Sequence, residues 1–337
     1  MSKKIAVLGA GAWGVTLARL LADNGHEVVL WEIDAHRAQT LKQERKLAHF
    51  PHAVLPLSVQ VTDVLEDAVR DREILLIVVP SQVMRSVASA VAKTKKDFSN
   101  TIIVSAAKGI DHDTMMRMSE VITVEVPVPP GNIAVLSGPT IARDVALGMP
   151  TAVTVASLNE KTAQLCQDVF MNQYFRVYTH HDVAGAETGG ALKNIIAIAA
   201  GICDGLNLGD NTKAALITRS LKEIIDLGTA LGGQPATYMG LTGLGDLLVT
   251  CMSRSSRNRT LGEKIAQGKS VADAQREIIM VAEGVEAAKS AHKIAQRFKI
   301  EIPIMEQIYQ VLYYQKPPAQ AVQELMARDA KPEMKSL

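Results

Sequence analysis

Short apolar runs alternate with stretches of helical periodicity through the first half of the chain. Residues 5–8 form an apolar run that ends at a glycine, and residues 15–22 continue with apolar side chains at helical spacing. Runs of this kind are typical of parallel strands that are buried on both faces. Further strands are predicted at residues 28–31, 74–79, 101–105, 133–137 and 152–156. The alternation of strands and helices predicts an α/β fold with a doubly wound parallel sheet.

The pattern changes beyond about His180, where the strand-like runs end. The segments that follow carry apolar residues at helical spacing and are interrupted by glycines. The predicted helices include residues 191–201, 214–227, 281–297 and 304–314. A chain of 337 residues is long enough for two domains. We therefore expect the sheet in residues 1–183 and an all-α domain in residues 184–337, with a crevice at their junction that holds the chemistry.

The turn after the first strand has the sequence GAGAWG, residues 9–14. Gly9 permits a tight turn, Gly11 lets a pyrophosphate approach the main chain, and Gly14 lets the helix pack against the strand. The N-terminus of that helix offers unpaired N–H groups and a partial positive charge to phosphates. The second strand ends at Glu32, which is suited to accept hydrogen bonds from ribose hydroxyls. A glycine turn that binds nothing accounts for the motif alone, whereas the whole spacing predicts a Rossmann dinucleotide site.

The residues after the second strand bear on the choice of cofactor. Glu32 would repel a ribose phosphate and therefore favours NAD. His36 and Arg37 lie close enough in the sequence to leave NADP open. We expect NAD or NADP, with NAD favoured.

The charge balance and the cysteine content limit which partners and which cellular compartment we expect for the protein. Lys and Arg number 36 against 35 Asp and Glu, so the bulk charge gives no reason to expect nucleic acid or an anionic membrane as a partner. The sequence opens directly on a strand, and the apolar run at residues 195–202 is too short to cross a bilayer. We expect a cytoplasmic protein without a bound metal. Three widely spaced cysteines are expected to be reduced: Cys166, Cys203 and Cys251.

Two lysines are candidates for chemistry. Lys193 lies in the least polar segment of the second half, GGALKNIIAIAAG, where loss of hydration would lower its pKa and let it exchange a proton. A lysine that extends from the end of a buried helix into solvent is the alternative. Lys108, in SAAKGID, follows a strand and is expected to point into the same crevice or to be a plain loop lysine.

Three further segments offer polar groups. The motif SGPT at residues 137–140 could hold substrate oxygens on its backbone or form an ordinary turn. Asp246 follows closely spaced glycines and could bind a substrate hydroxyl, orient Lys193, or cap the next helix. The segment SRSSRNR, residues 253–259, places Arg257 between a hydroxyl and an amide, which suits a phosphate, although a solvated basic loop is possible.

Two loops have roles that the sequence leaves open. Residues 78–82, VVPSQ, end a strand where loops commonly line a cofactor crevice, but a plain turn fits as well. Residues 49–56 could cover a ligand or merely connect two elements.

The order of the motifs resembles that of one enzyme family. GAGAWG, SAAKGID, LSGPTIARD, GALKNIIAIAAG, GLGDL, SRNR and VAEG occur in this order in the sequence. Over about residues 3–327 the chain resembles bacterial NAD(P)-dependent glycerol-3-phosphate dehydrogenase. The resemblance implies a Rossmann domain, an all-α domain like that of 6-phosphogluconate dehydrogenase, and reversible reduction of dihydroxyacetone phosphate to sn-glycerol 3-phosphate for glycerophospholipid synthesis.

The resemblance also implies roles for individual residues. The implied cofactor contacts are Ala12, Trp13, Lys108, Ala142, Arg257, Val281 and Glu283. The implied substrate contacts are Lys108, Gly138, Thr140, Lys193, Asp246, Ser256, Arg257 and Asn258, with Lys193 as the proton acceptor. One cofactor position departs from the family, which often has a polar or basic side chain where this chain has Ile33. The departure concerns an NADP contact and not the reaction.

The sequence alone leaves two other functions and the oligomeric state undecided. A dehydrogenase of the β-hydroxyacid type would also place a lysine on a helix of the second domain, but its substrate would carry a carboxylate. A protein that senses nicotinamide dinucleotides without catalysis is a more distant alternative. The apolar helical domain makes a homodimer plausible.

Overall fold

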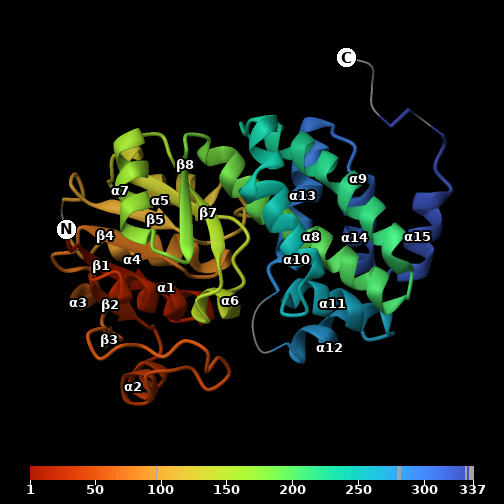
Figure 1. Cartoon of the computed structure of the whole chain (residues 1–337). Helices are drawn as coiled ribbons and strands as arrows, with labels where there is room; N and C mark the ends of the chain where they lie inside the picture. Colours follow the sequence, from red (N-terminus) through yellow and green to blue (C-terminus); the bar gives the residue numbers. More distant parts are fainter. Residues whose placement is uncertain (96, 279–281, 331, 334–337) are drawn as a thin grey trace.

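The sheet-containing half and the helical half of the molecule lie side by side in the computed structural model (Figure 1). The structure describes residues 1–95, 97–278, 282–330 and 332–333. Two hydrophobic clusters fill the two faces of the sheet, and a third fills the helical half. This distribution follows from the sequence, since strands buried on both faces need a covering layer of helices on each side.

The sheet has eight strands in the order β3-β2-β1-β4-β5-β6-β7-β8. The strands are β1 (Lys4–Leu8), β2 (Glu27–Trp31), β3 (Gln60–Thr62), β4 (Ile74–Ile77), β5 (Ile102–Ser105), β6 (Ile133–Ser137), β7 (Thr151–Ser157) and β8 (Phe175–His180). The strand order reverses between β1 and β4, the point at which doubly wound sheets bind ligands beyond the carboxyl ends of their strands. The glycine turn follows β1 at this point, as a dinucleotide site requires.

One edge of the sheet differs from the predicted parallel arrangement. The first six strands in this order, β3 through β6, pair in the parallel sense. Strand β7 pairs with β6 in the antiparallel sense, and β8 is parallel to β7. The connection from β6 to β7 contains only the five-residue helix α6 (Ala142–Ala146). A parallel crossover usually needs a full helix across the face of the sheet, so this short connection returns the chain in the opposite direction.

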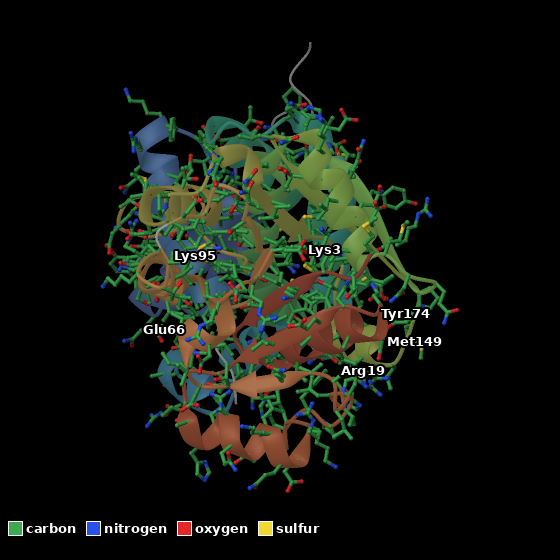
Figure 2. All side chains as sticks on the ribbon, turned by 90° about the vertical axis from the view of Figure 1, so that its left-hand side faces the viewer. Lys3, Arg19, Glu66, Lys95, Met149 and Tyr174 are labelled. Atoms are coloured by element: carbon green, nitrogen blue, oxygen red, sulfur yellow. The ribbon has the colours of Figure 1, made fainter. Side chains whose placement is uncertain are left out.

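The remaining helices of the sheet-containing half are amphipathic and cover its faces. They are α1 (Ala12–Asp23), α2 (Ala35–Glu44), α3 (Leu65–Val69), α4 (Met84–Ala92), α5 (Met118–Glu125) and α7 (Glu160–Phe170). Figure 2 shows Arg19 of α1 and Met149 on the same side of this half. The Arg19 guanidinium donates to the carbonyl oxygen of Ala146 at 3.3 Å, which ties α6 to α1.

The second half is built from helices, as the sequence predicts. They are α8 (Val183–Gly205), α9 (Gly209–Ala230), α10 (Asp246–Met252), α11 (Arg257–Ala266), α12 (Val271–Arg276), α13 (Gly284–Phe298), α14 (Pro303–Tyr314) and α15 (Pro318–Met326). Each of the four predicted helices coincides with one of these, although the predicted start at residue 281 lies outside the described residues. No helix within the described ranges is both long enough and apolar enough to cross a membrane.

Helix α8 lies at the centre of the molecule, between the sheet and the other helices (Figure 1). It is buried from Val183 to Cys203, which explains why its sequence is mostly apolar around the whole helix. Its buried length includes Lys193, so this lysine does not extend into solvent from a helix end. The sequence alternative of a solvent-reaching lysine is therefore wrong.

Candidate active site

The glycine turn has the geometry of a phosphate-binding loop. Gly9 has φ +113°, a conformation that side chains rarely adopt, and a Cβ at Gly14 would stand 1.9 Å from the Gly9 carbonyl oxygen. Gly11 is the N-cap of α1, and no side chain caps this helix end. The first N–H groups of α1 are therefore available for an anion. This open helix end fits a dinucleotide pyrophosphate.

Three small or aromatic side chains that the resemblance assigns to the cofactor lie beside this turn. Ala12 and Trp13 open α1, and Ala142 opens α6. All three are half-buried and pack against the same hydrophobic cluster of the sheet. The loop at residues 78–82 also reaches this region, because the backbone of Val78 contacts Gly9. Of the two interpretations of that loop, a position at the crevice fits the structure.

The second strand ends in a fixed carboxylate. Glu32 is buried, accepts a hydrogen bond from the Asp34 N–H at 3.1 Å and pairs with the Arg37 guanidinium at 3.1 Å. The side chain of Ile33 is 74% exposed beside it. The acidic and the basic residue that the sequence analysis relates to the choice between NAD and NADP, Glu32 and Arg37, are thus in contact.

A buried carboxylate joins the two candidate lysines. Asp246 is 1% exposed and bonds the Lys193 ammonium through Oδ1 and the Lys108 ammonium through Oδ2, both at 2.6 Å. Lys108 follows β5, Lys193 lies in the middle of α8, and Asp246 opens α10. The two halves of the chain therefore meet at this ion triplet. Asp246 does not cap α10, since its carboxylate is occupied by the lysines and the N-cap is Gly245.

The hydrogen bonds of Lys193 show which hydrogens of its ammonium group already have an acceptor. The hydroxyl of Thr250 donates to the backbone oxygen of Asp246 at 2.6 Å, so it accepts from the Lys193 ammonium, which lies at 2.6 Å. Within the described part of the chain, two ammonium hydrogens thus have acceptors and one is left for a substrate oxygen. Burial lowers the pKa of Lys193 to about 8, against the opposing effect of Asp246. An amine of this kind can give and take a proton near neutral pH.

Lys108 organises the SGPT segment. Its ammonium donates to the Gly138 carbonyl oxygen at 3.1 Å, and the Thr140 hydroxyl lies at 3.5 Å. Thr140 itself donates to the Gly138 oxygen at 3.1 Å. Lys108 is therefore held at the crevice and is not a plain loop lysine. The pair that the resemblance assigns to the substrate is held in one network with Asp246.

The remaining candidates lie at the start of α11 and α13. Ser256 caps α11, and the Asn258 side-chain oxygen accepts from the Gly284 N–H at 2.9 Å. Arg257 is exposed between them. Burial raises the pKa of Glu283, while the positive charges of Arg257, Lys108 and Lys193 oppose that change. Glu283 therefore lies within electrostatic range of Arg257 and of both candidate lysines.

Two residues that contact the site were not singled out from sequence. Thr250 lies one helical turn after Asp246, a spacing that places both side chains on one face of α10. Ser81 donates its backbone N–H to the Glu283 carboxylate at 3.5 Å, which links the two halves of the chain. The spacing in DLLVT could have indicated Thr250, but nothing local in the sequence indicates the contact of Ser81. Val281 lies outside the described residues.

Comparisons with known proteins agree with this architecture. The model of the NAD-dependent glycerol-3-phosphate dehydrogenase N-terminus matches residues 4–163, and the model of the C-terminus of the same enzyme matches residues 182–323. Relatives named glycerol-3-phosphate dehydrogenase [NAD(P)+] include one from Fusobacterium nucleatum, 49% identical over 334 residues and 99% of each chain. Another, from Geobacter sulfurreducens, is 48% identical over 335 residues and 99% of each chain.

A solved structure of a glycerol-3-phosphate dehydrogenase is similar to this chain over nearly its whole length. The glycerol-3-phosphate dehydrogenase of Coxiella burnetii superimposes with a TM-score of 0.92 at 37% identity, and covers 97% of this chain and 99% of its own. Ketopantoate reductase from Ralstonia eutropha superimposes with a TM-score of 0.59 at 16% identity, which shows a shared fold alone. The chain belongs to the NAD-dependent glycerol-3-phosphate dehydrogenase family.

Proposed function

We propose that the chain catalyses the reversible reduction of dihydroxyacetone phosphate to sn-glycerol 3-phosphate with NAD(H) or NADP(H). The observation that carries this proposal is the buried Lys193–Asp246–Lys108 triplet at the junction of the two halves. It provides a proton donor of suitable pKa beside the crevice that begins at the glycine turn. The identity of the substrate, dihydroxyacetone phosphate, is inferred from the family to which the chain belongs.

Lys193 is the group that exchanges the proton. When bound, the nicotinamide ring supplies a hydride to the C2 carbonyl. The Lys193 ammonium donates its remaining hydrogen to the carbonyl oxygen, stabilises the charge that develops there and transfers the proton. In the oxidation of glycerol 3-phosphate, the neutral amine takes the hydroxyl proton instead. Proton transfer of this kind is worth about 10²- to 10⁴-fold in rate.

The other groups hold the substrate in place. Two lysines around one carboxylate leave a net positive charge in the crevice, which favours an anionic substrate. Arg257, supported by Ser256 and Asn258, binds the phosphate through paired charge-assisted hydrogen bonds. Lys108, Gly138 and Thr140 fix the other oxygens of the substrate. Orientation of the ketone accounts for a further part of the rate.

The cofactor is held by the turn and the elements around it. Gly9, Gly11 and Gly14 admit the pyrophosphate at the N-terminus of α1, where no side chain competes for the N–H groups. Glu32 binds the adenosine ribose. The further cofactor contacts that we propose are Ala12, Trp13, Ile33, Lys108, Ala142, Arg257, Val281 and Glu283.

The organisation and setting of the enzyme are part of the proposal. Residues 1–183 form the cofactor domain and residues 184–337 the domain that supplies Lys193. We expect a cytoplasmic homodimer that provides sn-glycerol 3-phosphate for glycerophospholipid synthesis. Sedimentation equilibrium would test the dimer.

A spectrophotometric assay tests the reaction. Purified protein should oxidise NADH or NADPH only when dihydroxyacetone phosphate is added. A panel of β-keto acids serves as the control, because the β-hydroxyacid alternative requires a carboxylate substrate. Oxidation with a keto acid but not with dihydroxyacetone phosphate would overturn the proposal, and binding of NADH without any turnover would favour a sensing role.

A further inference from the structure

Glu187 is a buried carboxylate that the proposed reaction does not use. It lies on α8, is 5% exposed, and accepts from the backbone N–H of Ser119 at 2.8 Å and from the Ser119 hydroxyl at 2.5 Å. Ser119 belongs to the first turn of α5, so Glu187 satisfies a free N–H group of a helix in the opposite half of the chain. The negative charge is also favoured by the dipole of α5. The contact therefore joins the two halves by charge-assisted hydrogen bonds that are shielded from water.

The position of this carboxylate is costly. Burial raises the pKa of Glu187 to about 7, against the hydrogen bonds of Ser119 and the positive charge of Arg117. Arg117 itself pairs with Glu120, whose negative charge also disfavours an ionised Glu187. A buried charge that is only partly compensated contributes little to stability. The carboxylate is therefore better explained by the geometry that it fixes.

On the side of the sheet, the contact is close to Lys108 along the backbone. An isolated antiparallel bridge pairs Ile110 with Arg117. Lys108 lies two residues before this bridge, and Ser119 lies two residues after it. A displacement of Ser119 is thus passed through the bridge to Lys108.

On the side of the helices, the contact is joined to Lys193 by a rigid element. Glu187 and Lys193 lie six residues apart on α8, which corresponds to about 9 Å along the helix axis. The helix is buried over this length, and a closely packed interior transmits a displacement instead of absorbing it. The position of Glu187 thus determines that of Lys193.

The two paths meet again at Asp246, which binds both ammonium groups at 2.6 Å. The contacts form a ring, with Asp246 at one side and the contact between α8 and α5 at the other. We propose that Glu187 is a positioning residue of the reaction: its hold on α5 sets the distance between the two lysines and aims the free hydrogen of Lys193 at the crevice. The inference rests on the proposed function in that Lys193 exchanges the proton.

Replacement of Glu187 tests the inference. Glu187→Ala removes the contact and should lower kcat for dihydroxyacetone phosphate about 10- to 100-fold, because a displacement of about 1 Å is costly at a reacting centre. The Kd for NADH should change less than about twofold, since the glycine turn belongs to the sheet-containing half alone. Glu187→Gln keeps an acceptor for the Ser119 N–H and should restore most of the turnover.

Glu223 offers a matched control. It is also a glutamate with 5% exposure, and it accepts from the N–H groups of Ile304 and Met305 at 2.8 and 3.0 Å, at the start of α14. Burial raises its pKa to about 7 as well. This contact lies within the helical half. Glu223→Ala should therefore lower the urea midpoint about as much as Glu187→Ala does, while kcat of the folded enzyme stays within about twofold.

The pH profile separates a change of position from a loss of stability. The titratable groups that act on Lys193 include Asp246, Lys108, Cys251 and Glu283. Burial and the charge of Lys108 lower the pKa of Lys193, so this pKa rises if Lys108 moves away. In Glu187→Ala we expect the alkaline limb of ketone reduction to move to higher pH, whereas in Glu223→Ala it should stay in place.

A second variant serves if Glu187→Ala does not fold. Ser119→Ala keeps the backbone N–H and removes the hydroxyl donor, so it should lower kcat and move the limb in the same direction to a smaller extent. A limb that stays in place in Glu187→Ala, or in Ser119→Ala if only that variant folds, overturns the inference. An equal loss of turnover in Glu223→Ala overturns it as well, because both glutamates would then act through stability.

Nuclear magnetic resonance separates this inference from the proposed function. Lysines labelled with carbon-13 at Cε, with Lys193 assigned from the spectrum of Lys193→Met, report the pKa of Lys193 without turnover. If dihydroxyacetone phosphate is not reduced but this pKa rises in Glu187→Ala, the proposed function fails and the role of Glu187 in setting the lysine geometry stands. If dihydroxyacetone phosphate is reduced and the pKa is the same in both proteins, the proposed function stands and the inference fails.

Discussion

Lys193 is the residue whose surroundings matter most to the proposed reaction. Its pKa of about 8 means that the ammonium, which donates in reduction, predominates below that pH. The neutral amine, which accepts in oxidation, predominates above it. We therefore expect kcat for ketone reduction to fall as the pH rises through about 8, and kcat for oxidation to rise over the same range. Steady-state profiles in both directions check this.

Replacement of Lys193 tests the same role by a second route. Lys193→Met keeps the length of the side chain and removes the proton, so turnover should fall about 10²- to 10⁴-fold while NADH binding persists. Lys222→Met, at an exposed lysine of α9, is the matched control and should retain turnover. Near wild-type turnover in Lys193→Met would remove this residue from the mechanism.

Asp246 acts on Lys193 by its charge as well as by its position. Because the carboxylate raises the pKa of Lys193, its loss leaves burial and the charge of Lys108 to lower that pKa further. In Asp246→Asn we expect the alkaline limb of the reduction profile to move to lower pH, together with a lower kcat. Thr250→Val removes an uncharged acceptor of the ammonium and should lower kcat while moving the limb less than Asp246→Asn does. A limb that stays in place in Asp246→Asn would contradict the electrostatic role.

At the scale of elements, the packing of α8 against α11 positions the start of α11. A Cβ at Gly262 would stand 1.9 Å from the Ile198 carbonyl oxygen, and one at Gly201 would stand 1.9 Å from that of Arg259. Only glycines allow this approach of the two helices. The close contact brings Ser256 and Arg257 to the helix that carries Lys193.

Gly262→Ala should therefore separate the two helices. We expect a loss of about 1–3 kcal/mol in the free energy of unfolding, since the added methyl group overlaps backbone that cannot move aside easily. Urea denaturation checks this. Gly245→Ala is the control, because its added Cβ would find the nearest atom at 3.7 Å and its backbone is already helical. Equal stability of the two variants would show that α8 and α11 tolerate a wider spacing.

Elements with strong periodicity were predictable, and those defined by distant partners were not. The buried strands and helix α8 follow from continuous apolar runs. Strand β3 has only three residues, and β8 alternates buried and exposed side chains because it lies at the edge, so neither gives a long apolar run. The antiparallel turn at β7 depends on the short connection and not on the pattern of β7 itself. In the site, the sequence left Asp246 as a substrate contact, as a group that orients Lys193 or as a helix cap, and only the fold places it beside Lys193.

At the scale of the whole molecule, contacts between the halves keep the crevice in one geometry. Glu187 of α8 accepts from the backbone N–H of Ser119 at 2.8 Å and from its hydroxyl at 2.5 Å, near the start of α5. Burial raises the pKa of Glu187 to about 7. Ser81 and Glu283 form a second link. These contacts, together with the Lys108–Asp246 ion pair, join the sheet-containing half to the helical half.

The charge of the whole chain also explains why a single arginine should matter. With a formal net charge of +1, the protein has no strong overall field to attract a phosphorylated substrate, so capture depends on local groups. Arg257→Ala should lower kcat/KM for dihydroxyacetone phosphate about 10- to 100-fold, mainly through KM, because it removes charge-assisted hydrogen bonds to the phosphate. The kcat/KM for unphosphorylated dihydroxyacetone, which we expect to be a poorer substrate, should fall much less.

Arg254→Ala is the control variant, because it removes an exposed charge from the same segment. It should change kcat/KM for neither ketone by more than about twofold, since an exposed charge that does not touch the substrate is screened. An equal loss for both ketones in Arg257→Ala would place the guanidinium on the reacting end of the substrate or on the cofactor instead of the phosphate.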